Sequence, residues 1–421
     1  MTERLLQFIW QFQYFNRSEL TTATDETIQV ILPGQFNTNQ GPDFINSKIR
    51  INQALWVGNI ELHIKTSYWN RHKHEEDKNY SNVILHVVWE HDDKSMEKNI
   101  PILELRYRVS KILLQQYDTL MNNTAFIPCQ ENIKSIKEIT WNSWKERLLA
   151  ERLLRKASIV DHFLQQSNYH WEESFWWLLA RNFGMKVNAS AFETVARSIS
   201  LKILSRHKNQ IHQLEALLFG QAGFLQRNFN EDYPALLKKE YQFLQAKYKL
   251  KPVHEPFYFL RMRPGNFPTV RLAQLAILIN QSSHLFSKIK EAVSVKEIRQ
   301  WFDLAANDYW HYHYRFDEES AFKKKNIGNT MINNIIINTI APALFAYGNY
   351  NKEDKYKTKA LQWLEDTPAE TNAITKGFEL LGIQNGNAYD SQSLIELRNE
   401  YCNRKRCLDC AVGNYLLKKE S

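Results

Sequence analysis

The segment GNIELHIK, residues 58–65, decides how the N-terminal third of this chain folds. Apolar residues at positions 60, 62 and 64 alternate with polar ones. Successive side chains of a β-strand point to opposite faces of the sheet, so this alternation predicts a strand with one apolar face. The other face carries an acid, an imidazole and an amine from Glu61, His63 and Lys65. This polar row is either a solvated sheet face with ordinary cross-strand ion pairs or the wall of a site.

Strand signals continue on both sides of this segment. Runs with β-branched or alternating apolar residues lie between turn signals at 27–34, 47–53, 55–65, 82–92 and 100–109, after an amphipathic helix at the N-terminus. From about residue 133 onward, apolar residues recur three and four apart, which is typical of helices. We therefore predict an α+β protein. An N-terminal α/β domain with a mixed sheet covers residues 1–125, and a mostly α-helical domain covers residues 126–421.

The composition narrows the class of protein. Hydrophobic residues make up 43% of the 421 residues and aromatic residues 13%, which indicates a packed globular protein rather than a disordered one. No apolar run approaches the roughly 20 residues that span a bilayer, and the N-terminus lacks the pattern of a secretory signal. We therefore expect a cytoplasmic protein without a membrane partner. The net charge of +8 is compatible with nucleic acid as a partner, although many soluble proteins are mildly basic.

Two acidic residues form the first candidate site. Asp43, in PGQFNTNQGPDF, follows a Gly-Pro turn at the head of one expected strand, and Glu61 lies within the next. If these strands pair, both carboxylates converge and could hold Mg²⁺ or Mn²⁺, which would activate a water molecule. His63 or Lys65 could then move protons or stabilise developing charge. The alternative is that Asp43 is an ordinary turn residue.

A zinc site at His72, His74 and Asp77 is a second interpretation of the same region. The two histidines are separated by one residue, which is short for a pair on one helix face. The sequence places no third histidine beside them.

The cysteines form another candidate site. Cys402, Cys407 and Cys410 have C-x4-C-x2-C spacing, and Cys129 is the chain's fourth cysteine. In a reducing compartment such clustering favours metal ligation over disulfides. Cys129 would complete a four-thiolate set for a [4Fe–4S] cluster or for Zn²⁺, and the spacing does not decide between them. The alternative is a group of free buried cysteines.

The whole first domain resembles a bacterial family, domain of unknown function 2851. The matching stretches are PGQFNTNQGPDF, WVGNIELHIKTSYWNRHKHEED and NVILHVVWEHD, and similarity continues through FYFLRMRPGNFPTVRLAQLA to YCNRKRCLDCAVGNYLL. More distantly, the order helix, strand, Asp-headed strand, then E-x-H strand is similar to the PD-(D/E)XK nuclease superfamily. That resemblance implies a metal-dependent phosphodiesterase in which Asp43 and Glu61 hold the ion. His63 stands where the superfamily usually has lysine.

The cysteine pattern is similar to the iron–sulfur staple of helicase-associated and CRISPR-adaptation exonucleases. In those enzymes the nuclease motifs lie between the lone cysteine and the triplet, whereas here both acidic residues precede Cys129.

Basic residues near aromatic ones suggest contacts with phosphates and bases, although solvated charged faces would look the same. The candidates are Arg261, Arg263, Arg271, Arg404, Lys405 and Arg406. The leading prediction is a metal-dependent phosphodiesterase acting on DNA or RNA. The alternatives are a non-catalytic nucleic-acid-binding protein with a metal-stapled helical domain and a helical interaction scaffold.

Overall fold

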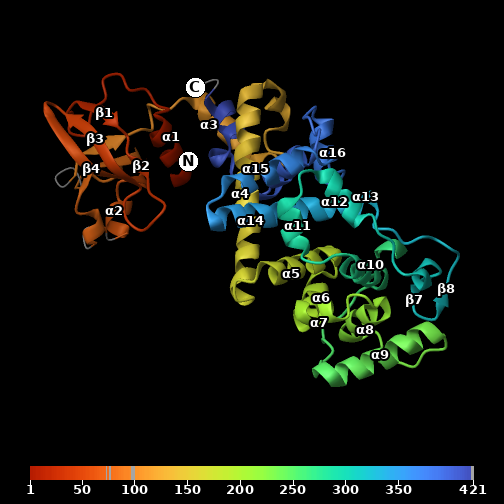
Figure 1. Cartoon of the computed structure of the whole chain (residues 1–421). Helices are drawn as coiled ribbons and strands as arrows, with labels where there is room; N and C mark the ends of the chain where they lie inside the picture. The colour runs from red at the N-terminus through yellow and green to blue at the C-terminus, as the bar shows by residue number, and fades with distance from the viewer. Residues whose placement is uncertain (73, 75–76, 96–99, 419–421) are drawn as a thin grey trace. The chain divides into compact units, whose positions relative to one another are not determined.

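The computed structural model describes residues 1–72, 74, 77–95 and 100–418 (Figure 1). Two compact units make up the chain. The first comprises Met1–Trp144 together with Leu397–Ser421, and the second comprises Lys145–Glu396. The architecture is α+β, with a mixed sheet in the N-terminal part and a large helical region, as the sequence predicted. The units divide the chain at other points than residue 125, and the cysteine-rich tail belongs to the first unit.

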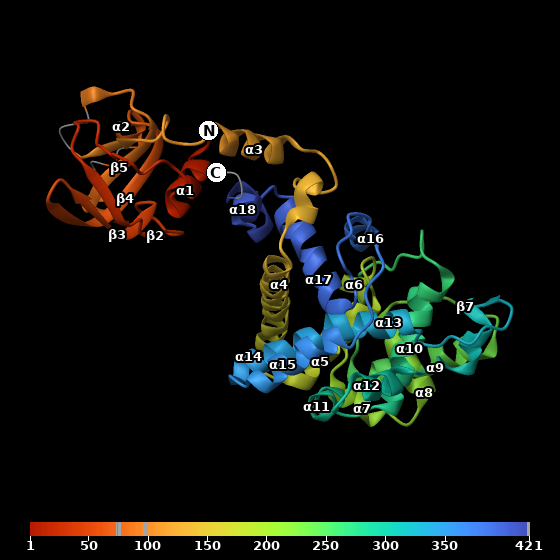
Figure 2. The ribbon, with the colours of Figure 1, turned by 90° about the horizontal axis from the view of Figure 1, so that it is seen from above.

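The first unit is built around a mixed sheet. Its elements before residue 137 are α1 (Glu3–Phe12), β1 (Ile28–Leu32), β2 (Gln35–Phe36), β3 (Phe44–Ile51), β4 (Ala54–Lys65), α2 (Tyr68–Arg71), η2 (Lys78–Tyr80), β5 (Val83–Glu90), β6 (Ile102–Glu104), α3 (Lys111–Asn122) and η4 (Gln130–Ser135). Among the described residues the strand order is β1-β3-β4-β5-β6, with β2 beside β3. β1, β3 and β4 are antiparallel, whereas β5 runs parallel to β4 and β6 parallel to β5. Helix α1 packs against β4 (Figure 2).

Strand β4 confirms the alternation read from GNIELHIK. Ile60 and Leu62 are fully buried in a core that includes apolar residues of α1. Gly58 allows the close approach of the next strand, because a Cβ there would lie 2.6 Å from the backbone oxygen of Asn82. The opposite face of β4 is also covered, since Glu61 is 6% and His63 2% exposed. A solvated sheet face therefore does not describe this polar row.

The C-terminal tail completes the first unit. It consists of η8 (Leu397–Cys402), η9 (Cys407–Asp409) and α18 (Ala411–Lys418). Leu408 and Leu417 are buried in the same cluster as the apolar residues of α1 and α3. An ion pair of 2.5 Å between Arg4 Nη2 of α1 and Asp409 Oδ1 of η9 joins the two ends of the chain. Burial of apolar side chains, rather than sequence proximity, places the tail in this unit.

The second unit is mostly helical and has its own apolar core. Helix α4 (Glu138–Gln166) begins before the unit boundary, and the remaining elements are α5 (Trp171–Phe183), α6 (Ala189–Ser198), α7 (Leu201–Arg206), α8 (Ile211–Gln221), α9 (Asp232–Tyr248), η5 (Pro264–Asn266), α10 (Pro268–Gln281), α11 (Leu285–Glu291), α12 (Val295–Phe302), η6 (Asp308–His311), β7 (His313–Arg315), β8 (Glu318–Glu319), α13 (Asn329–Ile335), η7 (Ile336–Ile340), α14 (Ala341–Asn351), α15 (Asp354–Glu365), α16 (Ala373–Leu380) and α17 (Ala388–Glu396). The helical periodicity from residue 133 onward correctly predicted this organisation.

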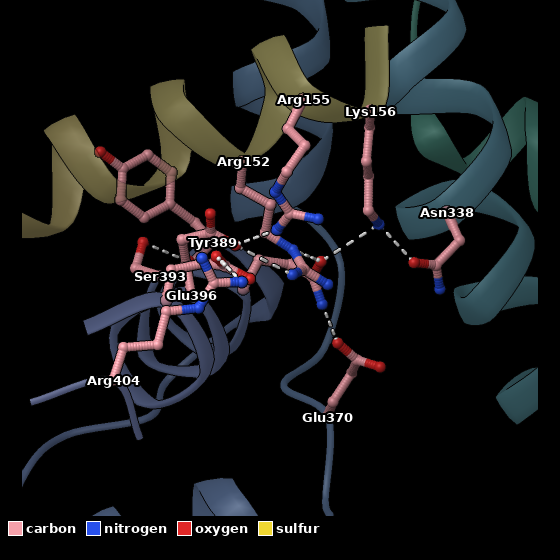
Figure 3. A network of polar contacts seen from close by, with 11 residues as sticks. Arg152, Arg155, Lys156, Asn338, Glu370, Tyr389, Ser393, Glu396 and Arg404 are labelled. Atoms are coloured by element: carbon pink, nitrogen blue, oxygen red, sulfur yellow. Dashed lines mark hydrogen bonds and ion pairs between the residues drawn. The ribbon is translucent and has the colours of Figure 1, made fainter. Parts of the chain in front are cut away.

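A polar network joins α4 to α17 within this unit (Figure 3). The Glu396 carboxylate accepts from two guanidinium groups, at 3.3 Å from Arg152 Nη1 and 2.5 Å from Arg155 Nη2. Arg152 Nε also donates to Gln392 Oε1 at 2.5 Å. Glu396 is thus a buried carboxylate with permanent cations beside it.

One continuous helical stretch, Asn329–Asn351, is long and apolar enough to cross a membrane by length and composition. Within the second unit, 78% of its apolar window is buried. Among the described residues it is the one candidate span, and its burial is that of a core helix.

Candidate metal centre

Asp43 and Glu61 interlock across the β3–β4 pair. Asp43 directly precedes β3, whose first residue Phe44 pairs with Ile60 of β4. The backbone N–H of Asp43 donates to Glu61 Oε2 at 3.0 Å, and the backbone N–H of Leu62 donates to Asp43 Oδ2 at 3.0 Å. The structure therefore brings together the two acids that the sequence singled out.

Both carboxyl groups are held in an environment that disfavours their charge. Burial raises the pKa of Asp43 and of Glu61, and the charge of Asp43 raises the pKa of Glu61 further. The Gln7 side chain of α1 donates to Asp43 Oδ1 at 2.8 Å, which partly offsets the loss of water. Two neighbouring buried carboxylates are stable together when a cation shares them.

Histidines surround the free oxygen of Glu61. His63 Nε2 and His74 Nε2 lie 3.5 Å and 3.6 Å from Glu61 Oε1. His63 Nε2 also lies 3.4 Å from His74 Nε2 and 3.1 Å from His72 Nδ1. β4 supplies Glu61 and His63, while the segment after α2 supplies the other two rings.

These spacings match the ligand sphere of a transition metal. Zinc bonds to nitrogen and oxygen are about 2.0–2.2 Å long, so ligand atoms around a tetrahedral ion lie about 3.4 Å apart. The four measured separations run from 3.1 to 3.6 Å, and the ring nitrogens of His63, His72 and His74 all lie within 4.8 Å of one another. One ion of that size fits between the three imidazoles, and Glu61 Oε1 lies beside His63 and His74 of this group.

Two of the imidazoles, those of His63 and His74, are in the protonation state that a metal requires. Burial and, to a smaller extent, the adjacent histidines lower the pKa of His63 to about 2. Burial likewise lowers the pKa of His74. Neutral imidazoles are ligands, whereas protonated ones are not.

His86 of β5 orients His63 from behind. Its Nε2 lies 2.9 Å from His63 Nδ1, and β5 places it opposite Glu61 in the parallel register. Burial lowers the pKa of His86 to about 3, so this ring is neutral and its Nε2 can accept a hydrogen bond from His63 Nδ1–H. That hydrogen bond leaves His63 Nε2 free to face an ion, which is the usual arrangement behind a metal-bound histidine.

The cluster is closed by aromatic rings on one side and reaches solvent on another. Tyr80 stacks on His74 with ring centroids 3.8 Å apart, and Trp69 packs against His74 and His86. His72 is exposed. A ligand could therefore approach the ring nitrogens past His72.

Sequence reasoning weighed the histidines separately and missed their convergence. The zinc interpretation at His72 and His74 found no third histidine, but the structure supplies His63, which we had assigned to proton transfer. Asp77 instead caps η2, accepting from the backbone of Asn79 at 2.9 Å. The predicted site residues do not include His86 of NVILHVVWE, although a lone histidine inside an apolar strand is a signal for it.

Lys65 does not join the cluster. It is part-exposed, and its Nζ lies 3.8 Å from Asp92 Oδ2. We had expected Lys65 to share charge stabilisation with His63, and the structure places only His63 beside Glu61.

The predicted nucleic-acid contacts occupy different settings. Arg271 is only 6% exposed, and its guanidinium donates to Gln274 and Asn266, so it is not presented to a ligand. The other five candidates are exposed: Arg261, Arg263, Arg404, Lys405 and Arg406. The four cysteines line a single cavity in the first unit.

Comparison with known proteins identifies the family of the chain, but the description of that family names no activity. The chain belongs to the family described as "Protein of unknown function (DUF2851)", whose model matches residues 3–373. No curated protein and no solved structure matches the chain.

Proposed function

We propose that this DUF2851 member is a cytoplasmic metal-dependent phosphodiesterase acting on DNA or RNA. The observation that supports it best is the group of buried Glu61, His63 and His74 with exposed His72, in which four ligand-atom separations are 3.1–3.6 Å. Asp43 holds Glu61 in place through its backbone N–H. An ion bound there would polarise a phosphodiester and lower the pKa of an attacking water.

The types of ligand atom in the site indicate which metal ion it would bind. Three imidazoles and one carboxylate favour Mn²⁺, Fe²⁺ or Zn²⁺, because Mg²⁺ prefers oxygen ligands and keeps much of its water. Of the two ions expected from the sequence, Mn²⁺ is the one that this site suits.

The order of elements and the charge support a nucleic-acid substrate. An α1 helix, an Asp-headed β3, and a β4 carrying Glu61-x-His63 follow one another as in PD-(D/E)XK nucleases. Arg71 and Lys78, both exposed, flank the histidine segment and could contact phosphates. The net charge of +8 favours association with a polyanion.

The test combines metal binding with cleavage. Purified protein is titrated with Mn²⁺, Mg²⁺ and Zn²⁺ by calorimetry and incubated with single-stranded and duplex DNA and RNA. Glu61→Gln and His74→Ala should lose metal binding and cleavage together. Glu90→Gln, on the same sheet but paired with Arg106 at 3.0 Å, is the matched control and should keep both.

Two results would overturn the proposal. Cleavage by Glu61→Gln equal to that of the wild type would assign the activity to a contaminant. Tight metal binding without cleavage of any substrate would leave a structural metal centre and no phosphodiesterase.

A further inference from the structure

The four cysteines of the chain meet in the first unit although up to 281 positions separate them (410 minus 129). Cys129 directly precedes η4, Cys402 ends η8, Cys407 begins η9 and Cys410 follows it. All four line one cavity, and all four are free thiols rather than disulfides. Tertiary folding, not spacing alone, has therefore gathered every cysteine of the protein.

The backbone has unusual local conformations beside these cysteines. η8 is a π-helix that ends at Cys402, and π-helical turns are rare and concentrate at functional sites. The chain then turns back so tightly that a Cβ on Gly413 would lie 2.1 Å from the backbone oxygen of Cys407. Asn414 holds this turn, because its side chain donates to the carbonyl oxygens of Leu408 and Cys410.

Hydrogen-bond donors converge on one sulfur. The backbone N–H groups of Val412 and Gly413 lower the pKa of the Cys410 thiol, so they face its sulfur. Donors of this kind stabilise thiolates and surround the sulfurs of metal centres. A buried neutral thiol gains little from such donors, since sulfur is a weak acceptor until it is ionised.

Cationic side chains lie near the thiols. Cys402, Cys407 and Cys410 are buried and Cys129 is partly buried, with Arg398 near Cys402 and Lys405 near Cys407. Four thiolates around a metal centre carry a net negative charge, which these cations offset.

We propose that Cys129, Cys402, Cys407 and Cys410 bind one iron–sulfur cluster through four thiolates. Among the described residues, no three cysteine sulfurs all lie within 4.8 Å of one another, as the ligands of a single zinc ion would, whereas a cluster holds its cysteine sulfurs farther apart. Binding releases the four thiol protons and reduces or oxidises nothing when the incoming species is a preformed cluster. The centre fastens the C-terminal tail to the residues before η4. This inference does not depend on the proposed phosphodiesterase, whose ligands are histidines and a carboxylate.

The first experiment measures what the full chain contains. Protein purified without oxygen is analysed for zinc, iron and acid-labile sulfide and by visible absorption. A brown protein with about four iron and four sulfide per chain supports the proposal. A colourless protein that does not take up a reconstituted cluster, whether or not it contains zinc, overturns it.

The second experiment assigns the metal to the cysteines. Cys402→Ser should lose the centre, whereas Arg404→Ala, an exposed change in the same tail, should keep it. His74→Ala should also keep it, which separates this centre from the one at Glu61. Retention of the full metal content in both Cys402→Ser and Cys407→Ser would overturn the assignment.

A third measurement covers the case in which the cysteine variants do not fold. Limited proteolysis of the wild-type chain is followed before and after chelation. Removal of the metal should speed cleavage after residue 397 relative to cleavage within the second unit. Equal rates before and after metal removal would contradict the fastening role.

Discussion

Two groups of buried polar side chains differ in how their charge is balanced. In the second unit, Glu396 accepts from Arg152 and Arg155, whose guanidinium groups are always charged (Figure 3). In the first unit, Glu61 faces His63 and His74, whose pKa values burial has lowered, so these neighbours are neutral. The neighbours of Glu396 therefore neutralise its charge, whereas the histidines beside Glu61 carry no charge that would neutralise its carboxylate.

This difference separates a structural network from a candidate site. A buried carboxylate with matched cations holds helices together and needs nothing further. A buried carboxylate among neutral nitrogen donors spaced for a metal has the composition of a ligand sphere that lacks its cation. The following predictions test this contrast, from the largest expected effect to the smallest.

Removing the Glu396 carboxylate should lower the free energy of unfolding the most. Glu396→Ala leaves Arg152 partly buried without its carboxylate, so we expect the free energy of unfolding of the second unit to fall by about 3–5 kcal/mol. Urea denaturation measures it. The control is Glu318→Ala, which removes an exposed partner of Arg315 and should cost less than about 1 kcal/mol. Similar losses in both variants would mean that Glu396 is no more than a surface partner.

A third buried carboxyl group provides a reference with neutral donors but no imidazoles. Glu215 accepts from Tyr233 at 2.8 Å and Trp310 at 3.1 Å, and burial raises its pKa from 4.5 to about 7. The folded state therefore holds this proton more tightly. Its contribution to stability is full below about pH 4.5 and is lost as the pH rises through about 7, at about 1.4 kcal/mol per unit of pKa difference.

Glu215→Gln should remove that pH dependence. The stability of the variant relative to the wild type should rise between about pH 5 and pH 8, as measured by urea midpoints across the range. A difference that stays constant with pH would show that Glu215 is not protonated in the folded protein.

Removing the Glu61 carboxyl group should have the opposite effect on stability in metal-free protein. We expect Glu61→Gln to unfold at the same or a higher urea concentration than the wild type without metal, because burial raises the pKa of Glu61 and the amide replaces a carboxyl group that already favours its neutral form. Mn²⁺ at about 100 times its dissociation constant should stabilise the wild type by about 2.7 kcal/mol and leave the variant unchanged. Strong destabilisation of metal-free Glu61→Gln would make Glu61 a structural residue like Glu396.

Removing the His86 ring, which contacts His63, should have a smaller effect on metal affinity. His86→Ala removes the partner of His63 Nδ1, so we expect metal affinity to fall about 10–100-fold while the stoichiometry stays the same. Calorimetry measures both quantities. Unchanged affinity would show that packing alone orients His63.

Lys65 should matter least. Its pair with Asp92 is part-exposed, so Lys65→Ala should change stability by less than about 1 kcal/mol and should leave metal affinity unchanged. Catalysis provides the sharper readout, because a loss of cleavage at unchanged metal binding would return to Lys65 the role that the sequence suggested.

Local patterns in the sequence determined much of this protein. Alternation in GNIELHIK predicted β4, apolar repeats three and four apart predicted the helical region, and the Gly-Pro turn placed Asp43 at the head of β3. These features depend on neighbours within a few residues, which the sequence displays directly. The pairing of Asp43 with Glu61 also followed, because consecutive strands usually lie side by side.

Only the tertiary structure decided which side chains share a site. The turn after α2 folds His72 and His74 back onto β4, the parallel register of β5 places His86 behind His63, and the packed C-terminal tail brings three cysteines to Cys129. Burial then sets the protonation of these groups, since the same histidine or carboxyl group would titrate normally in water. Distances and desolvation arise from long-range packing, and no local pattern in a single sequence encodes them.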